Sequence, residues 1–95
     1  MIKTTQVNVT TPLTAVALGS TAIQAGLSVI IKAKQDNTGT IGVGASATAC
    51  LLNGSSYFSL EAGQVIMVRI ANLNEVYIDA SVAGEGVEIL YEPFI

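Results

Sequence analysis

The chain has 95 residues, enough for one domain with one small hydrophobic core. Hydrophobic residues make up 51% of it, charged residues only 12%, and the net charge is −3. With four basic residues in all, the chain has no basic stripe to neutralise phosphates, which argues against nucleic-acid binding. The apolar excess predicts a subunit that buries part of its surface against other copies or another protein.

The first dozen residues alternate only weakly between apolar and polar types and end at Pro12. We therefore predict an extended N-terminal arm over residues 1–12, with Ile2, Val7 and Val9 docking on a neighbouring molecule. The polar start has no apolar segment of the kind a signal peptide needs, so we expect none. Residues 13–31 are uncharged but rich in Ser, Thr, Gln and Gly, so we do not expect a membrane span.

Residues 27–33 are the first clear strand, because apolar side chains recur at every second position. Ile30 lies on the opposite, polar face of this predicted strand. Turns are predicted at residues 25–27 and 61–64, each leading the chain into a strand.

A turn is also predicted at the sequence DNTG. Asp36 and Asn37 favour turns because their side chains bond to nearby backbone, and Gly39 is expected to take a positive φ that closes a hairpin. The second strand of that hairpin would contain Ile41 and Val43.

The sequence GVGASA fits the loose dinucleotide-binding pattern G-x-G-x-x-A at Gly42, Gly44 and Ala47. That pattern binds pyrophosphate only where a helix begins within it, and the following residues are too short and interrupted for a helix. We interpret the glycines as part of a hairpin in which small residues permit strand twist or close packing. Cys50 follows in an apolar run and is expected to be a buried, unreactive thiol.

The second half of the chain alternates three times, over residues 64–71, 75–82 and 86–92. The connections are short, so these strands are predicted to be antiparallel neighbours. The expected core residues are Leu27, Val29, Ile31, Ile41, Val43, Ile66, Val68, Ile70, Val76, Ile78, Val87 and Ile89.

Three apolar residues lie on the polar faces of their strands: Ile30, Met67 and Leu90. The chain then ends in Phe94 and Ile95, after Pro93, which cannot donate to a sheet. Together with the low charge, these positions predict an interface with other subunits or a partner.

No segment keeps an apolar period of 3.6 residues, and seven or eight short strands recur at roughly even spacing. The fold class is therefore predicted as all-β: a small antiparallel β-sandwich of jelly-roll type, with residues 1–95 as a single domain.

Catalytic chemistry is not indicated. The chain has no histidine, which removes Ser-His and Cys-His mechanisms and the usual zinc sites. Glu88 and Glu92 would lie about 13 Å apart along a strand, too far for paired acid–base work, and are interpreted as solvated edge charges. Asp36 and Asn37 alone do not make a calcium site. We expect no cofactor, no metal and no enzyme activity.

Several short motifs occur in a fixed order along about two thirds of the chain. They are Ile31-Lys32-Ala33, Asp36 to Thr40, Val43-Gly44 with Ser46, Phe58 to Gly63, Asn72-Leu73 with Val76-Tyr77, and Val87 through Glu92. In this order they resemble a small virion protein common in tailed bacteriophages. Many such proteins have a proline in the turn before the strand that starts here at Gln64, where this chain reads LEAGQ.

The resemblance implies a small β-sandwich on the virion surface, made in the host cytoplasm. It suggests a capsid decoration protein that binds the assembled head through the major capsid protein as a homo-oligomer, with a trimer favoured. The alternative is a head-fibre base or tail-tip adhesin that recognises a host glycan. The loops argue against that alternative, because they consist mostly of Gly, Asn, Ser and Ala.

Overall fold

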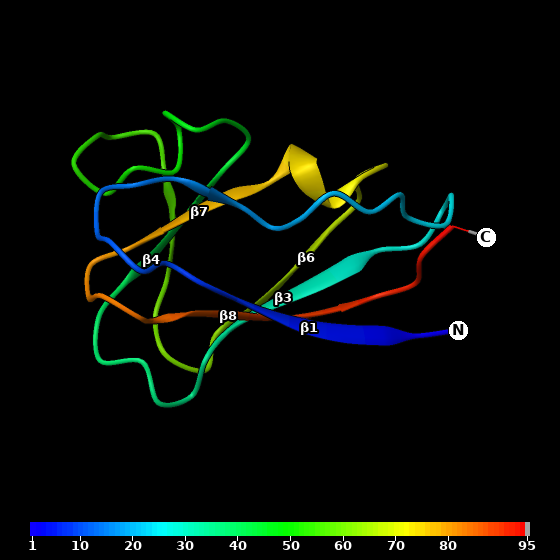
Figure 1. The fold of residues 1–95 in the computed structure, drawn as a ribbon, viewed down its shortest axis with the longest axis horizontal. Coiled ribbons are helices and arrows are strands. Elements are labelled where there is room, and N and C mark those ends of the chain that lie inside the picture. Colours follow the sequence, from blue (N-terminus) through cyan, green and yellow to red (C-terminus); the bar gives the residue numbers. More distant parts are fainter. Residues whose placement is uncertain (95) are drawn as a thin grey trace.

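The computed structural model describes residues 1–94, and Ile95 lies outside the described residues. The regular structure of this range consists of strands and one short 3₁₀ helix, η1 (Figure 1). The elements are β1 (Lys3–Asn8), β2 (Val16–Ala17), β3 (Val29–Ala33), β4 (Ile41–Gly44), β5 (Phe58–Leu60), β6 (Val65–Val68), η1 (Leu73–Glu75), β7 (Tyr77–Ala80) and β8 (Gly86–Tyr91).

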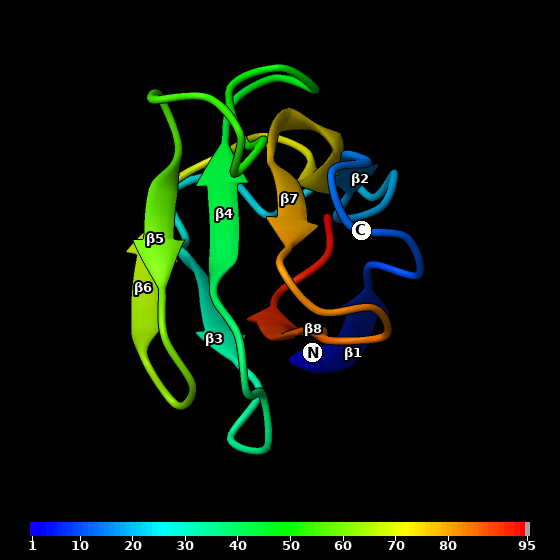
Figure 2. The ribbon, with the colours of Figure 1, turned by 90° about the vertical axis from the view of Figure 1, so that its left-hand side faces the viewer.

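The eight strands form two four-stranded sheets in which the paired strands are antiparallel. Sheet A has the order β1-β8-β3-β6, and sheet B has the order β2-β7-β4-β5. Figure 2 shows them as two layers, with β5 and β6 on one side of the molecule and β1 and β2 on the other. The prediction of an all-β protein is confirmed, and the arrangement is sandwich-like.

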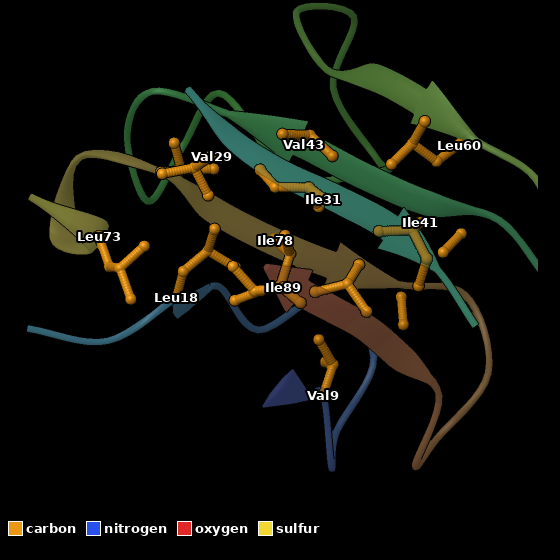
Figure 3. Close-up of a cluster of buried hydrophobic side chains, with 14 of the residues drawn as sticks. Val9, Leu18, Val29, Ile31, Ile41, Val43, Leu60, Leu73, Ile78 and Ile89 are labelled. Atoms are coloured by element: carbon orange, nitrogen blue, oxygen red, sulfur yellow. The ribbon is translucent and has the colours of Figure 1, made fainter. Parts of the chain in front are cut away.

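The core lies between the sheets and is built from both. Ile31 and Ile89 of sheet A and Ile41 and Ile78 of sheet B are each at most 1% exposed and belong to one cluster of contacting side chains (Figure 3). Eight of the twelve predicted core residues are buried: Val29, Ile31, Ile41, Val43, Val76, Ile78, Val87 and Ile89. Three more, Ile66, Val68 and Ile70, are partly buried against the cluster.

Leu27 is the exception among the predicted core residues, because it is 43% exposed. The turn at Gly26 precedes it, and β3 begins only at Val29. Side chains alternate between the faces of a sheet only within a strand, so the alternation cannot be extended backwards to Leu27. The core also includes residues that the alternation did not mark: Val9, Leu18, Ile23, Leu60 and Leu73.

The predicted pairing of consecutive strands is wrong. β3 and β4 lie in different sheets and do not form the expected hairpin, and β7 lies in sheet B while β6 and β8 lie in sheet A. The connections cross from one layer to the other. Both sheets bury one face, so strands of either sheet have the same two-residue period, and a short connection does not reveal which sheet comes next.

The predicted N-terminal arm is also wrong. β1 is paired with β8 along its whole length, from Lys3 opposite Tyr91 to Asn8 opposite Gly86. Val9 then enters the core and is fully buried. Backbone pairing with the edge of β8 suffices to order a strand whose side-chain alternation is weak, which the side-chain pattern alone could not reveal.

The turn after β3 lies two residues earlier than predicted, over residues 34–37 and not 36–39. The Asn37 N–H donates to the Lys34 carbonyl at 3.1 Å, and the buried Asn37 side chain donates to the Gly86 carbonyl at 2.9 Å. Gly39 does not have the positive φ that we predicted. It is needed for space, because a Cβ there would collide with Ser81 Oγ.

Positive φ values occur instead at Gly26 and Gly63, within the predicted turns at residues 25–27 and 61–64. Those two turns are confirmed.

Candidate protein-interaction surface

The outer face of sheet B, which points away from sheet A, is covered by the chain itself. The loop of residues 45–57 folds back over β4, where Gly42 and Gly44 lie on the outward face. A Cβ on Gly44 would come within 2.5 Å of the Cys50 nitrogen and 2.6 Å of the Ala49 carbonyl carbon. The glycines of the GVGASA sequence therefore permit close packing of this loop, which is one of the two roles that the sequence left open.

Asp79 holds the covering loops in place through hydrogen bonds. Although it lies on the outer face of β7, it is fully buried, and its carboxylate accepts hydrogen bonds from two loops. Oδ1 accepts from the N–H of Leu13 at 2.8 Å and Oδ2 from that of Leu52 at 2.9 Å. Oδ1 also accepts from the Ala80 N–H at 2.8 Å. These bonds give a buried carboxylate the partners that it requires.

Cys50 belongs to the same loop and is fully buried, as predicted. Burial raises the pKa of its thiol, and the nearby Asp79 charge raises it further. A raised thiol pKa lowers the fraction of reactive thiolate, so Cys50 is a packing residue.

The outer face of sheet A is different, because an apolar row crosses it. In the register of the sheet, Thr4 lies opposite Leu90, Leu90 opposite Ile30, and Ile30 opposite Met67. Facing side chains on neighbouring strands are about 5 Å apart at Cβ, so Leu90, Ile30 and Met67 form a continuous strip. The sequence marked these three residues singly, and the sheet brings them together.

A second row on this face carries charges that neutralise each other. Gln6 lies opposite Glu88, Glu88 opposite Lys32, and Lys32 opposite Val65. Lys32 Nζ lies 3.8 Å from Glu88 Oε1. Glu88 is on β8, which lies between β1 and β3, so its interpretation as an edge charge is wrong.

Two further apolar residues extend the face at one end. Ile2 is 64% exposed and Leu27 43%, and together with Ile30 and Leu90 they border a hollow of about 290 Å³. We call the whole set the sheet A patch; it consists of Ile2, Leu27, Ile30, Val65, Met67 and Leu90. The patch residues carry no charge, and the charges of Lys32 and Glu88 beside them neutralise each other.

The remaining predicted interface residues differ in how exposed they are. Val9 is buried in the core and cannot contact a partner, and Val7 is half-buried against that core. The side chain of Phe94 is 61% exposed, while its backbone N–H donates to the Ala22 carbonyl at 2.9 Å. Ile95 lies outside the described residues.

Sequence reasoning missed the role of Glu85. Its carboxylate accepts bonds from the Thr38 N–H at 2.7 Å, the Thr38 hydroxyl at 2.8 Å and the Gly39 N–H at 2.9 Å. These bonds, led by that of the Thr38 N–H, lower the pKa of Glu85. The contact links the β3–β4 connection to the β7–β8 connection, which are 46 residues apart in the chain.

Within residues 1–94 there is no group of three or more His, Cys, Asp or Glu side chains placed to hold a metal ion. In the same range no helix has the length and apolarity needed to cross a membrane. The sheet A patch is therefore the feature that the geometry singles out.

No protein family, curated protein or solved structure matches this chain in the comparisons with known proteins.

Proposed function

We propose that the chain is a non-enzymatic structural protein of a tailed-bacteriophage virion, a capsid decoration protein that binds and stabilises the assembled head. The observation that carries this proposal is the sheet A patch, a neutral apolar surface without a cover from the described chain. Large exposed apolar surfaces on small proteins are typical of protein–protein interfaces. The order of sequence motifs that resembles phage virion proteins supplies the kind of partner.

The strand order supports a jelly roll as the detailed fold. The orders β1-β8-β3-β6 and β2-β7-β4-β5 place consecutive strands mostly in opposite sheets, with the chain ends meeting in sheet A. An eight-stranded double sheet with two Greek keys is the jelly-roll pattern, which is common in viral capsid proteins. We propose this topology for the whole chain.

The mechanism is mass action. A protein that binds only the intact shell stabilises that shell by the free energy of binding. Burial of one large apolar side chain contributes roughly 1.5–3 kcal/mol, so several patch residues against the major capsid protein suffice for a stable contact. The proposed location is the virion surface, and the proposed partners are the major capsid protein and other copies of the chain, with a trimer favoured by the resemblance.

Binding to bare, expanded heads of the phage that encodes the chain tests this function. Purified protein is incubated with the heads, and bound copies are counted by electron cryomicroscopy. We expect saturable binding at micromolar protein, and its loss in Ile30→Lys, which places a charge at the centre of the patch. Leu13→Lys is the matched control, since Leu13 is 52% exposed and lies outside sheet A. Absence of binding by the unaltered protein would refute a decoration role.

The alternative is an adhesin module of a head fibre or tail tip that recognises a host glycan. The observation that favours it is a shallow hollow of about 540 Å³ on the outer face of sheet A, whose polar lining includes Thr4, Gln6, Lys32 and Glu88. Aromatic rings, on which sugars commonly stack, do not line this hollow. A glycan array probed with the purified protein decides, and an array without hits removes the alternative.

A further inference from the structure

β6 is an edge strand of unusual composition. It is the last strand of sheet A, paired with β3 on one side only. Its four residues are all apolar and uncharged, with Val65 52% and Met67 70% exposed. Exposed edge strands of this kind readily pair with another chain, and most proteins protect them with charges, prolines or short length.

The backbone of β6 presents unpaired groups at that edge. The Ala33 N–H at the end of β3 donates to the carbonyl of Gln64, the residue before β6, at 2.9 Å, whereas the next N–H along the chain, that of Lys34, donates to the Gly86 carbonyl on the β8 side at 3.2 Å. The backbone of Gln64 is therefore directed toward β3. Since alternate residues of an antiparallel strand bond to the same neighbour, Ile66 and Val68 direct their backbone groups to β3. Those of Val65 and Met67 then point away from the sheet, and they make no other hydrogen bond within residues 1–94.

An apolar groove follows the same edge. The edge strands β5 and β6 lie on the same side of the molecule (Figure 2), and a hollow of about 470 Å³ lies there. Its lining includes Phe58, Ile66, Val68 and Ile70, and the side chains of Ile66, Val68 and Ile70 are only partly buried. A strand added beside β6 would place every second side chain in this groove and so extend the core.

The other edges of the two sheets are shorter or more polar than β6, which has four apolar residues and is followed by Arg69. β1 carries Lys3 and polar outward side chains, β2 has only two residues, and β5 has three residues followed by Glu61. A partner for β6 must offer an extended edge with free backbone groups, and an apolar one matches the composition of β6 and of the groove beside it. In the described chain β6 is itself the edge strand that meets these requirements.

We propose that a second copy of this chain docks on β6, so that the two β6 strands pair antiparallel about a twofold axis at Met67. This joins two copies of sheet A into one continuous eight-stranded sheet. Each Val65 then lies opposite Arg69 of the other copy, and each Ile66 opposite Val68, so that no like charges meet. Identical surfaces related by a twofold axis are the commonest arrangement in protein oligomers.

The contact deepens the homo-oligomer part of the proposed function and does not depend on a phage head. It leaves Ile2, Leu27, Ile30 and Leu90 free for another protein. By itself it makes a dimer, in contrast to the trimer favoured by the resemblance, so the mass of the purified protein separates the two.

Engineered disulfides test the register. In the proposed pair the two Met67 Cα atoms are about 5.5 Å apart, within the range that a disulfide spans. The two Val65 Cα atoms are about 14 Å apart, beyond that range. Under mild oxidation Met67→Cys should form a covalent dimer and Val65→Cys should not, with the unaltered protein and its buried Cys50 as the blank. Equal cross-linking of both variants, or none of Met67→Cys, would overturn the proposal.

Charge repulsion provides a second test. Met67→Lys places two ammonium groups together at the axis, and its exposed position should leave the fold intact. Sedimentation of the unaltered protein should give a dimer, and the variant should dissociate at least about tenfold more readily. Leu13→Lys is the control and should remain dimeric. A monomer at millimolar concentration, a trimer, or a dimer indifferent to Met67→Lys would each overturn the contact, whatever the outcome of head binding.

Discussion

The outer faces of the two sheets differ in what covers them, although both are built from antiparallel strands. On sheet B, Gly42 and Gly44 leave room for a loop, and Asp79 accepts a hydrogen bond from the Leu52 N–H of that loop. On sheet A the outward positions carry Ile30 and Leu90, which are partly buried, and the register joins them to the exposed Met67 in one row. One face is covered by its own chain, and the other is not.

The difference shows where the apolar excess of this chain lies. An inward face must be apolar in either sheet, so composition alone cannot distinguish the two. Small and acidic residues on an outward face accompany an intramolecular cover, whereas large apolar residues without such a cover are available to another molecule. The two faces can be disturbed separately, which makes the comparison testable.

The largest expected effect is the loss of a core contact shared by both sheets. Ile78→Ala removes a fully buried side chain between the sheets and should lower the free energy of unfolding by about 2–5 kcal/mol. Denaturant unfolding measures it. Ile30→Ala, on the open face, should cost clearly less, and a loss below about 0.5 kcal/mol for Ile78→Ala would mean that the assigned faces are inverted.

Loss of the Asp79 carboxylate should open the covered face. Asp79→Ala leaves the N–H groups of Leu13 and Leu52 without their acceptor and should cost about 2–4 kcal/mol in denaturant unfolding. Because Cys50 is part of this loop and is buried by its packing on sheet B, release of the loop should expose the thiol, which should then react faster with a thiol reagent. Asp79→Asn retains one acceptor oxygen, so its stability and its Cys50 reactivity should lie between those of Asp79→Ala and the unaltered protein. Unchanged reactivity of Cys50 in Asp79→Ala would contradict the role of Asp79 in holding the loop in place.

A smaller effect is expected from crowding beneath the loop. Gly44→Ala forces the Cys50 and Ala49 backbone away and should cost about 1–3 kcal/mol in the same assay. Gly54→Ala is the matched control in the same loop, since its Cβ would meet only Leu51 O at an ordinary 3.5 Å. If both variants were equally stable, close packing would not explain the glycines of β4.

The smallest expected effect concerns Glu85, which joins the connections between the sheets and not either face. Its pKa is lowered from the usual 4.5 by the hydrogen bonds of Thr38 and Gly39. A carboxyl with a lowered folded pKa stabilises the fold above its unfolded pKa, and this contribution disappears as the pH falls through the folded value. The free energy of unfolding of Glu85→Gln should therefore be lower than that of the unaltered protein near neutral pH. This difference should become smaller as the pH is lowered. A gap that widens in acid would have the wrong sign.

Several strands, two turns and the burial of Cys50 were predictable from the sequence, because they depend on residues close together in the chain. Two-residue alternation located β3, β6, β7 and β8 and their inward faces, since side-chain direction in a strand depends only on position within it. The turns at Gly26 and Gly63 followed from backbone freedom at glycine. The buried Cys50 followed from its apolar neighbours.

Long-range pairing was decided only by the tertiary structure. The alternation of Val29 and Ile31 is the same whether β3 pairs with β4 or with β6 and β8, so the choice of sheet depends on how both layers close over one core. Gly39 and Asp79 owe their roles to segments more than 25 residues away, which local patterns do not report. For the same reason Ile30, Met67 and Leu90 were recognisable singly, but their union into one surface required the register of three strands, which backbone hydrogen bonding sets and the side chains do not reveal.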